Sequence, residues 1–216
     1  MAERPKFWRL VMQTGRNMLF LDADVAVISN PLQELIGDAD LEAQIDEKEL
    51  WRARDMNLSP QLCAGAFLLK SNERTLRFLD QLENDLKTQR GGIIDDQEGM
   101  NLIIHDSTMA RILNRFENTE SGITPIGGFK KGVTDERLSV RFVPVERYLN
   151  GHVWGREVDT DYRRGKGVFM RWKGDLLGEE WLPALLHLNG HGFGDKEHWM
   201  KHCSWWYIRE DGTCKL

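Results

Sequence analysis

Two aspartates separated by one residue, Asp22 and Asp24, follow directly after an apolar segment at residues 18–21. Because an unpaired carboxylate is costly at the end of a buried strand, a positive partner is expected beside them. In an extended backbone both side chains would lie on the same side and could face one cation. Carboxylate oxygens suit Mg²⁺ or Mn²⁺, so the pair predicts a divalent metal site. The alternative interpretation is a turn with solvated aspartates.

A histidine follows another apolar segment, at residues 182–186. The imidazole of His187 would be a further metal ligand, one that suits manganese better than magnesium. Asn189 and Gly190 come next, and the glycines of this segment leave backbone N–H groups free to approach a phosphate. Lys196 adds positive charge. The segment therefore predicts phosphate binding beside a metal, although a lone histidine is also common in protein cores.

An acid and an amide, Asp96 and Gln97, follow the apolar pair at residues 93–94. Together with Asp95 they could hold a sugar hydroxyl, act as a base or stabilise positive charge. Adjacent acids in a loop are usually solvated, so this interpretation depends on the other two motifs.

The motifs need strands and helices that bring them together. A helix capped by Gly15, a buried strand at residues 18–21 and a short helix after Pro31 are expected near the start. Further expected elements are a strand near residues 50–55, a strand at 63–70, a helix from residue 73 that Gly91 and Gly92 stop, a strand at 140–145 and a helix at 195–208. In open α/β sheets ligands collect where strands end, so an α/β fold would gather the three motifs in one site.

Composition limits the classes of function. The 216 residues suit one domain with a substantial core, and 41% apolar with 29% charged residues is ordinary for a globular protein. A net charge of -5 argues against a nucleic-acid partner, because such proteins need a basic surface. No apolar run is long enough to cross a bilayer. Among the three cysteines, Cys203 and Cys214 could pair across a short loop.

Four segments resemble a known family in order and spacing. They are NMLFLDADVAVISNPL, CAGAFLLKSNERTLRFLDQL, DDQEGMNLI and HLNGHGFGDK. Over about residues 5–200 the chain is similar to the nucleotide-diphospho-sugar transferases, glycosyltransferases with the GT-A fold. The resemblance implies a Rossmann-like mixed sheet flanked by helices and a metal-dependent, retaining transfer of a hexose or pentose. It also implies a UDP-sugar donor, a glycan or glycoprotein acceptor and, in eukaryotes, the Golgi lumen.

The resemblance assigns a role to each matching residue. Asp22, Asp24 and His187 match the ligands of a divalent ion, commonly Mn²⁺ and otherwise Mg²⁺, on the donor diphosphate. Gly190 and Lys196 match phosphate-contacting positions, and Asn189 lies in the same donor-binding segment. Ala64 and Gly65 match small residues beside the donor sugar, and Asp96 and Gln97 match an acid and an amide at its anomeric carbon. Residues 1–110 would then hold the metal and donor sugar, and residues 111–216 the acceptor side and the His/Lys motif of a single domain.

Two departures from the family pattern affect these expectations. Cys63 stands where related enzymes often have an asparagine that contacts the sugar, which leaves the donor preference open. The family also carries β-α units ahead of the Asp-x-Asp strand, and this chain has almost nothing there. A fragment, one half of a split enzyme with a partner chain, or a protein with weakened donor binding is expected, with Arg4 or Lys6 as a remaining donor-contacting residue.

Two other functions remain as alternatives. A phosphatase of the haloacid dehalogenase type also places Asp-x-Asp after an early apolar strand, with Asp22 as nucleophile. It needs a lysine before its final acidic pair, whereas here Asp95 and Asp96 precede Lys130. A non-catalytic module that binds sugars or a partner through the Trp-rich C-terminal end is the second alternative.

Overall fold

The computed structural model describes residues 3–33, 35, 39–46, 61–89, 95–113, 115–119, 122–126, 136–143, 148–150, 184–188 and 196. The strand expected near residues 50–55 lies outside the described residues, as does the helix expected over 195–208 except for Lys196. Asn189, Gly190 and the two C-terminal cysteines also lie outside them.

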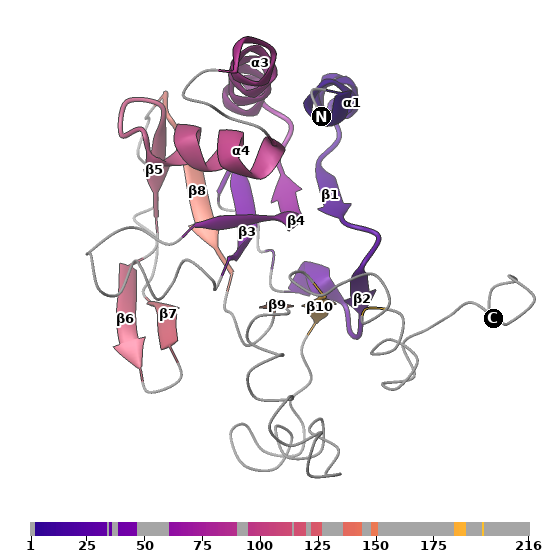
Figure 1. Cartoon of the computed structure of the whole chain (residues 1–216), viewed down its shortest axis with the longest axis vertical. Coiled ribbons are helices and arrows are strands. Elements are labelled where there is room, and N and C mark those ends of the chain that lie inside the picture. Colours follow the sequence, from indigo (N-terminus) through magenta and orange to yellow (C-terminus); the bar gives the residue numbers. More distant parts are fainter. Residues whose placement is uncertain are drawn as a thin grey trace, which may run out of the picture.

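The helices and strands follow one another along the whole described chain (Figure 1). In order they are α1 (Glu3–Gln13), β1 (Met18–Leu21), β2 (Val25–Val27), the 3-10 helix η1 (Pro31–Gln33), β3 (Leu41–Ile45), β4 (Leu62–Leu69), α3 (Glu73–Thr88), α4 (Asp96–His105), β5 (Ala110–Ile112), β6 (Arg115–Thr119), β7 (Gly122–Ile126), β8 (Leu138–Phe142), β9 (Tyr148–Asn150) and β10 (Leu185–His187).

Most strands belong to a five-stranded mixed sheet with the order β1-β4-β3-β8-β5. Strand β4 is antiparallel to both of its neighbours, whereas β3, β8 and β5 run parallel. A second sheet has the order β2-β10-β9 and lies below the first in Figure 1, and β6 and β7 form a separate hairpin. The architecture is the mixed α/β fold with flanking helices that the sequence predicts. The prediction of one domain divided near residue 110 stays a prediction.

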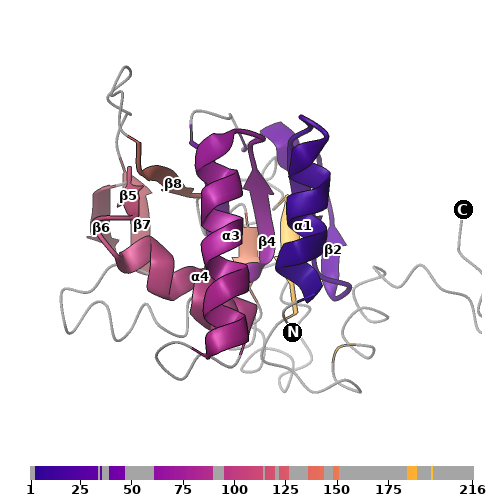
Figure 2. The ribbon, with the colours of Figure 1, turned by 90° about the horizontal axis from the view of Figure 1, so that it is seen from above.

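Two clusters of apolar side chains lie on the two faces of β4. Phe67 and Leu69 belong to the larger cluster, while Ala66 and Leu68 belong to the smaller one. Because both faces of β4 are covered, its whole length is buried, which explains why its sequence is apolar without alternation. The larger cluster also contains side chains of α1, α3 and α4, which lie on one side of the sheet, with α1 and α3 side by side (Figure 2).

Capping residues define the ends of the helices. Asn72 and Thr75 form a reciprocal capping box at the start of α3, as the sequence indicates. Helix α3 ends at Thr88, and Gln89 caps it in the left-handed conformation, before the two glycines that were expected to stop it. Gly15 has a φ of 77° after α1, which explains the need for glycine there. No helix in the described ranges is both long and apolar enough to span a bilayer.

Strand β3 was not predicted from the sequence, because its residues lie in a polar, acidic segment. Leu41, Ala43 and Ile45 point into the larger apolar cluster. The residues between and beside them are buried polar groups: Asp40, Glu42, Gln44 and Asp46. Each of these has a partner: Arg74 for Asp40, Arg141 for Glu42, Tyr148 and His187 for Gln44, and Gln97 for Asp46. The side chains on one face of β3 therefore pack into the apolar core, and those on the other face make polar contacts that extend to the candidate site.

Replacing Arg74 with methionine should lower the free energy of unfolding by about 2 kcal/mol at neutral pH. Arg74 makes two hydrogen bonds of 2.7 Å to Asp40, whose side chain is 3% exposed. Burial would raise the pKa of Asp40, but hydrogen bonds from Arg74 and Ser139 outweigh it and hold that pKa below its usual value. This stabilisation exists above the unfolded pKa of about 3.9 and is lost as the pH falls through the folded pKa. Urea unfolding at several pH values measures it.

The matched control is Arg77→Met, one helical turn further along α3. Arg77 contacts the exposed Glu73 at 4.0 Å and donates an exposed hydrogen bond of 3.0 Å to the carbonyl of Glu136, so this substitution should cost less than about 1 kcal/mol. An equal loss of unfolding free energy in the two variants, or a difference between them that persists at low pH, would contradict the role given to the pair of Arg74 and Asp40.

Candidate functional site

The Asp-x-Asp segment is a turn that connects the two larger sheets. It joins β1 to β2, and the N–H of Val25 donates to the carbonyl of Asp22 at 3.1 Å. The expected extended backbone is therefore wrong. The N–H of Asp22 donates to the carbonyl of Gly65 at 2.8 Å, and the N–H of Leu188 donates to the carbonyl of Asp24 at 3.1 Å. These bonds attach the turn to β4 on one side and to the end of β10 on the other.

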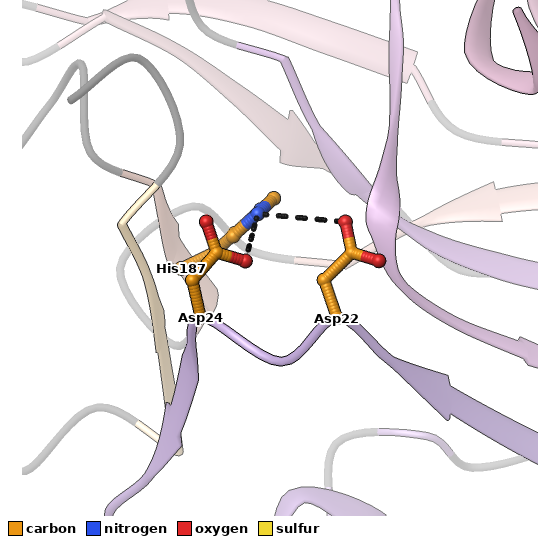
Figure 3. A group of neighbouring side chains, drawn as sticks. All are labelled: Asp22, Asp24 and His187. Carbon is orange, nitrogen blue, oxygen red and sulfur yellow. Dashed lines mark ion pairs between the residues drawn. The ribbon is translucent and has the colours of Figure 1, made fainter. Parts of the chain in front are cut away.

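Both carboxylates of the turn face the imidazole of His187 (Figure 3). His187 Nε2 lies 3.3 Å from Asp24 Oδ1 and 3.9 Å from Asp22 Oδ2. One ligand atom from each of the three residues lies within 4.8 Å of the others, an arrangement that could hold a metal ion. Ligands at about 2.1 Å from one octahedral ion lie about 3 to 4 Å apart, so the set fits one cation after small adjustments.

Each carboxylate has one oxygen toward His187 and the other toward a separate cation. Asp24 Oδ2 accepts a hydrogen bond of 2.6 Å from Lys196, and Asp22 Oδ1 accepts one of 2.7 Å from Arg4. Burial would raise the pKa of Asp24, but hydrogen bonds to His187 and Lys196 outweigh it and hold that pKa well below its usual value. Asp24 is therefore ionised at neutral pH and available to a cation.

Gly65 leaves the space that the imidazole occupies. A Cβ atom at this position would lie 2.0 Å from Cε1 and 2.5 Å from Nδ1 of His187. No side chain fits there unless the ring moves. The ring is therefore placed against the backbone of β4 and is 4% exposed. The sequence predicts Gly65 beside a donor sugar, and the structure shows that this residue also makes room for His187.

Two more side chains contact the inner nitrogen of the ring. His187 Nδ1 lies 3.2 Å from Gln44 Oε1 and 3.3 Å from Cys63 Sγ. Burial, together with the nearby carboxylates of Asp46, Asp22 and Asp24, raises the pKa of Cys63 to about 12. Cys63 is therefore a neutral thiol rather than a thiolate ligand. Cys63 therefore differs from the family pattern in residue type, and it also contacts the imidazole of His187.

Asp96 is joined to the Asp-x-Asp turn through Arg4. The guanidinium donates from Nη1 to Asp96 Oδ2 at 3.0 Å and from Nη2 to Asp22 Oδ1 at 2.7 Å. Asp96 is the first residue of α4 and is 5% exposed. Asp95 instead caps α4 by accepting a hydrogen bond of 2.8 Å from the N–H of Glu98. The two adjacent acids thus have different environments.

Gln97 is held by two elements of the large sheet. Its Oε1 accepts a hydrogen bond of 3.0 Å from the N–H of Ala64, and its Nε2 donates to Asp46 Oδ2 at 2.9 Å. Ala64 and Gln97, which the sequence predicts near the donor sugar, are therefore in direct contact.

The described part of the predicted site forms one connected group: Asp22, Asp24, Ala64, Gly65, Asp96, Gln97, His187 and Lys196. Their roles in binding and catalysis stay predictions. The sequence interpretation missed Gln44 and Asp46, which hold His187 and Gln97. The alternation of apolar and polar residues from Asp40 to Asp46 could have indicated a strand with a functional polar face.

Comparisons with known proteins identify the family of the chain. A family model described as nucleotide-diphospho-sugar transferase matches residues 1–200. The UDP-galactose:fucoside alpha-3-galactosyltransferase of Dictyostelium discoideum is 30% identical over 105 residues, which make up 47% of this chain and 15% of that protein. The match thus spans much less than two thirds of this relative's length. No solved structure matches the chain significantly. Because the family model covers almost the full length, the chain belongs to the nucleotide-diphospho-sugar transferase family.

Proposed function

We propose that this chain is a divalent-metal-dependent glycosyltransferase that moves a sugar from a UDP-sugar to a hydroxyl group of a glycan or glycoprotein, with retention of configuration. The observation that carries the proposal is the group of Asp22, Asp24 and His187 with Lys196 beside it. Membership of the family supplies the donor class, and the name of the Dictyostelium relative makes UDP-galactose the first donor to test.

The chemistry of the three side chains suits Mn²⁺. Two carboxylate oxygens and one imidazole nitrogen are ligands that Mn²⁺ accepts readily, while Mg²⁺ prefers oxygen alone. Such an ion, when bound, would act as a Lewis acid toward the departing diphosphate. Lys196 would add a positive charge for a phosphate oxygen, because its ammonium group already lies against Asp24.

Asp96 and Gln97 are proposed to face the anomeric carbon of the donor sugar. Positive charge develops on the sugar ring as the bond to the diphosphate breaks, and a nearby carboxylate stabilises that charge. Arg4 holds the carboxylate of Asp96 in place, and the N–H of Ala64 donates to the side-chain amide oxygen of Gln97. Because Arg4 also holds Asp22, one guanidinium aligns the residues proposed for the sugar with those proposed for the diphosphate.

The proposal is tested by ligand-dependent stability and by transfer. UDP at 100 times its Kd should raise the free energy of unfolding by about 2.7 kcal/mol, and it should do so only in the presence of Mn²⁺. The Asp24→Ala variant should lose this effect. Calorimetry with UDP and Mn²⁺ gives the affinity, and a panel of UDP-sugars, beginning with UDP-galactose, identifies the donor.

Glu73→Ala is the control for loss of one carboxylate, because the side chain of Glu73 is 94% exposed at the start of α3. It should bind UDP and Mn²⁺ as the unaltered chain does. Absence of Mn²⁺-dependent UDP binding would contradict the proposal and favour a non-catalytic module. Hydrolysis of an aryl phosphate that Asp22→Asn abolishes would favour the phosphatase instead.

A further inference from the structure

Gln44 connects the large sheet to the imidazole of the candidate metal site. It lies on β3, whereas His187 lies on β10 in the other sheet. The side chain is completely buried, with 0% exposure. Its Oε1 lies 3.2 Å from His187 Nδ1, and its Nε2 lies 2.9 Å from the carbonyl oxygen of Tyr148. The amide therefore has a defined partner at each end.

The carbonyl of Tyr148 fixes which end of the amide faces the imidazole. A carbonyl oxygen only accepts hydrogen bonds, so the NH₂ group of Gln44 must point toward it. The amide oxygen then faces His187, and it too can only accept. The contact between Gln44 and His187 is a hydrogen bond only if Nδ1 carries a hydrogen. In the neutral ring, this leaves the lone pair on Nε2.

The position of that lone pair matches the candidate metal site. Nε2 is the atom that lies 3.3 Å from Asp24 and 3.9 Å from Asp22. With the opposite tautomer, Nε2 would carry the hydrogen and could not bind a metal ion. The Cys63 thiol, 3.3 Å from Nδ1, is both a weaker donor and a weaker acceptor than an amide, so it does not decide the tautomer.

We propose that Gln44 is a positioning residue that selects the Nδ1–H tautomer of His187 and thereby makes Nε2 the metal-binding atom. Gly65 leaves room for the ring, and Gln44 orients the ring by accepting a hydrogen bond from Nδ1. Partners of this kind typically contribute 10 to 100-fold to metal affinity, roughly the loss expected on removing the amide. The inference rests on the proposed function for the metal, but the hydrogen on Nδ1 is a property of the metal-free protein, in which Nε2 can also carry a hydrogen bonded to Asp24.

Nitrogen-15 NMR of the metal-free chain tests the tautomer directly. Long-range correlations between ring hydrogens and nitrogens distinguish Nδ1–H from Nε2–H, and His187→Asn identifies the signal of His187 among the six histidines. The unaltered chain should show a hydrogen on Nδ1, whether or not Nε2 also carries one toward Asp24. Gln44→Met, which keeps the length of the side chain without the amide, should show a mixture or the other tautomer. Mn²⁺ titration followed by electron paramagnetic resonance should give an affinity of Gln44→Met for Mn²⁺ that is about 10 to 100-fold lower than that of the unaltered chain.

Two further variants separate orientation from stability. Gln44→Glu keeps an acceptor toward Nδ1, so it should retain both the Nδ1–H signal and most of the Mn²⁺ affinity. It should still lower stability, because an ionised carboxylate cannot donate to the carbonyl of Tyr148. Thr75→Val removes a buried hydroxyl from the capping box of α3, beyond the far end of β4 from Gly65. It should lower stability without changing the tautomer or the Mn²⁺ affinity.

A ring that carries its hydrogen on Nε2 alone in the unaltered chain would overturn the inference, even if Gln44→Met does not fold. An unchanged tautomer and unchanged Mn²⁺ affinity in Gln44→Met would overturn it as well. If the chain binds no Mn²⁺ but shows an Nδ1–H signal that depends on Gln44, the positioning role stands and the proposed function fails. The two ideas can therefore be rejected separately.

Discussion

Replacing Gly65 with alanine is expected to lower Mn²⁺ affinity by at least about 100-fold, more than the loss of a supporting hydrogen bond would. The added Cβ would lie 2.0 Å from His187 Cε1, and the backbone of His187 is paired to strands on both sides. Because the ring cannot keep its place, its nitrogen moves away from the carboxylates. The crowding should also cost about 1 to 3 kcal/mol of stability. Mn²⁺ titration and urea unfolding measure the two effects.

Gly15→Ala is the matched control for this substitution. Gly15 has a φ of 77° and nothing within 4 Å of an added Cβ, so alanine there should cost about 1 kcal/mol through backbone strain alone. Its Mn²⁺ affinity should not change. In the Gly65→Ala background, His187→Ala should restore part of the lost stability, because it removes the ring that clashes. Normal Mn²⁺ binding by Gly65→Ala would show that His187 is not a ligand.

Asp96→Asn is expected to lower the rate of sugar transfer by about 100 to 1,000-fold while Mn²⁺ and UDP bind as before. The substitution keeps the size of the side chain and removes the charge that would oppose positive charge on the sugar. Asp96 is buried, and its Arg4 partner also has Asp22, so the cation keeps one carboxylate. Steady-state transfer rates, together with calorimetry of UDP and Mn²⁺, separate the chemical step from binding.

The neighbouring acid provides a control of the same chemical type. Asp95→Asn should leave transfer unchanged, because Asp95 caps α4 and asparagine caps helices equally well. Loss of transfer in Asp95→Asn with normal rates in Asp96→Asn would show that the acid is assigned to the wrong position. Loss of Mn²⁺ binding in Asp96→Asn would place this residue in the metal site instead.

Much of the candidate site could be predicted from residue type and spacing. Asp22, Asp24 and His187 were expected around one cation, and the structure places them within reach of one another. The expected geometry was wrong in one detail, because the Asp-x-Asp segment is a turn rather than an extended strand end. The three residues meet where β1 passes into β2 and where β10 ends.

The polar residues of β3 explain why the supporting contacts could not be predicted. Asp40 and Glu42 are buried because each meets an arginine from a distant segment, Arg74 or Arg141. Such pairing is not visible in a local window of sequence, where these residues suggest an exposed loop. Glutamine is a common polar residue that indicates no particular role in the sequence. Only the fold shows that both ends of the Gln44 amide have partners.

The order of β2, β10 and β9 in the smaller sheet has a consequence for how the chain folds during synthesis. Strand β10 is the middle strand and comes last of the three in the sequence, so β2 and β9 have no partner in this sheet until it has been made. Contacts between such distant segments form slowly. Asp22 therefore meets Arg4, only 18 residues away, long before it can meet His187. On the ribosome, this nearby arginine can balance the charge of Asp22 while most of the polypeptide is still to be translated.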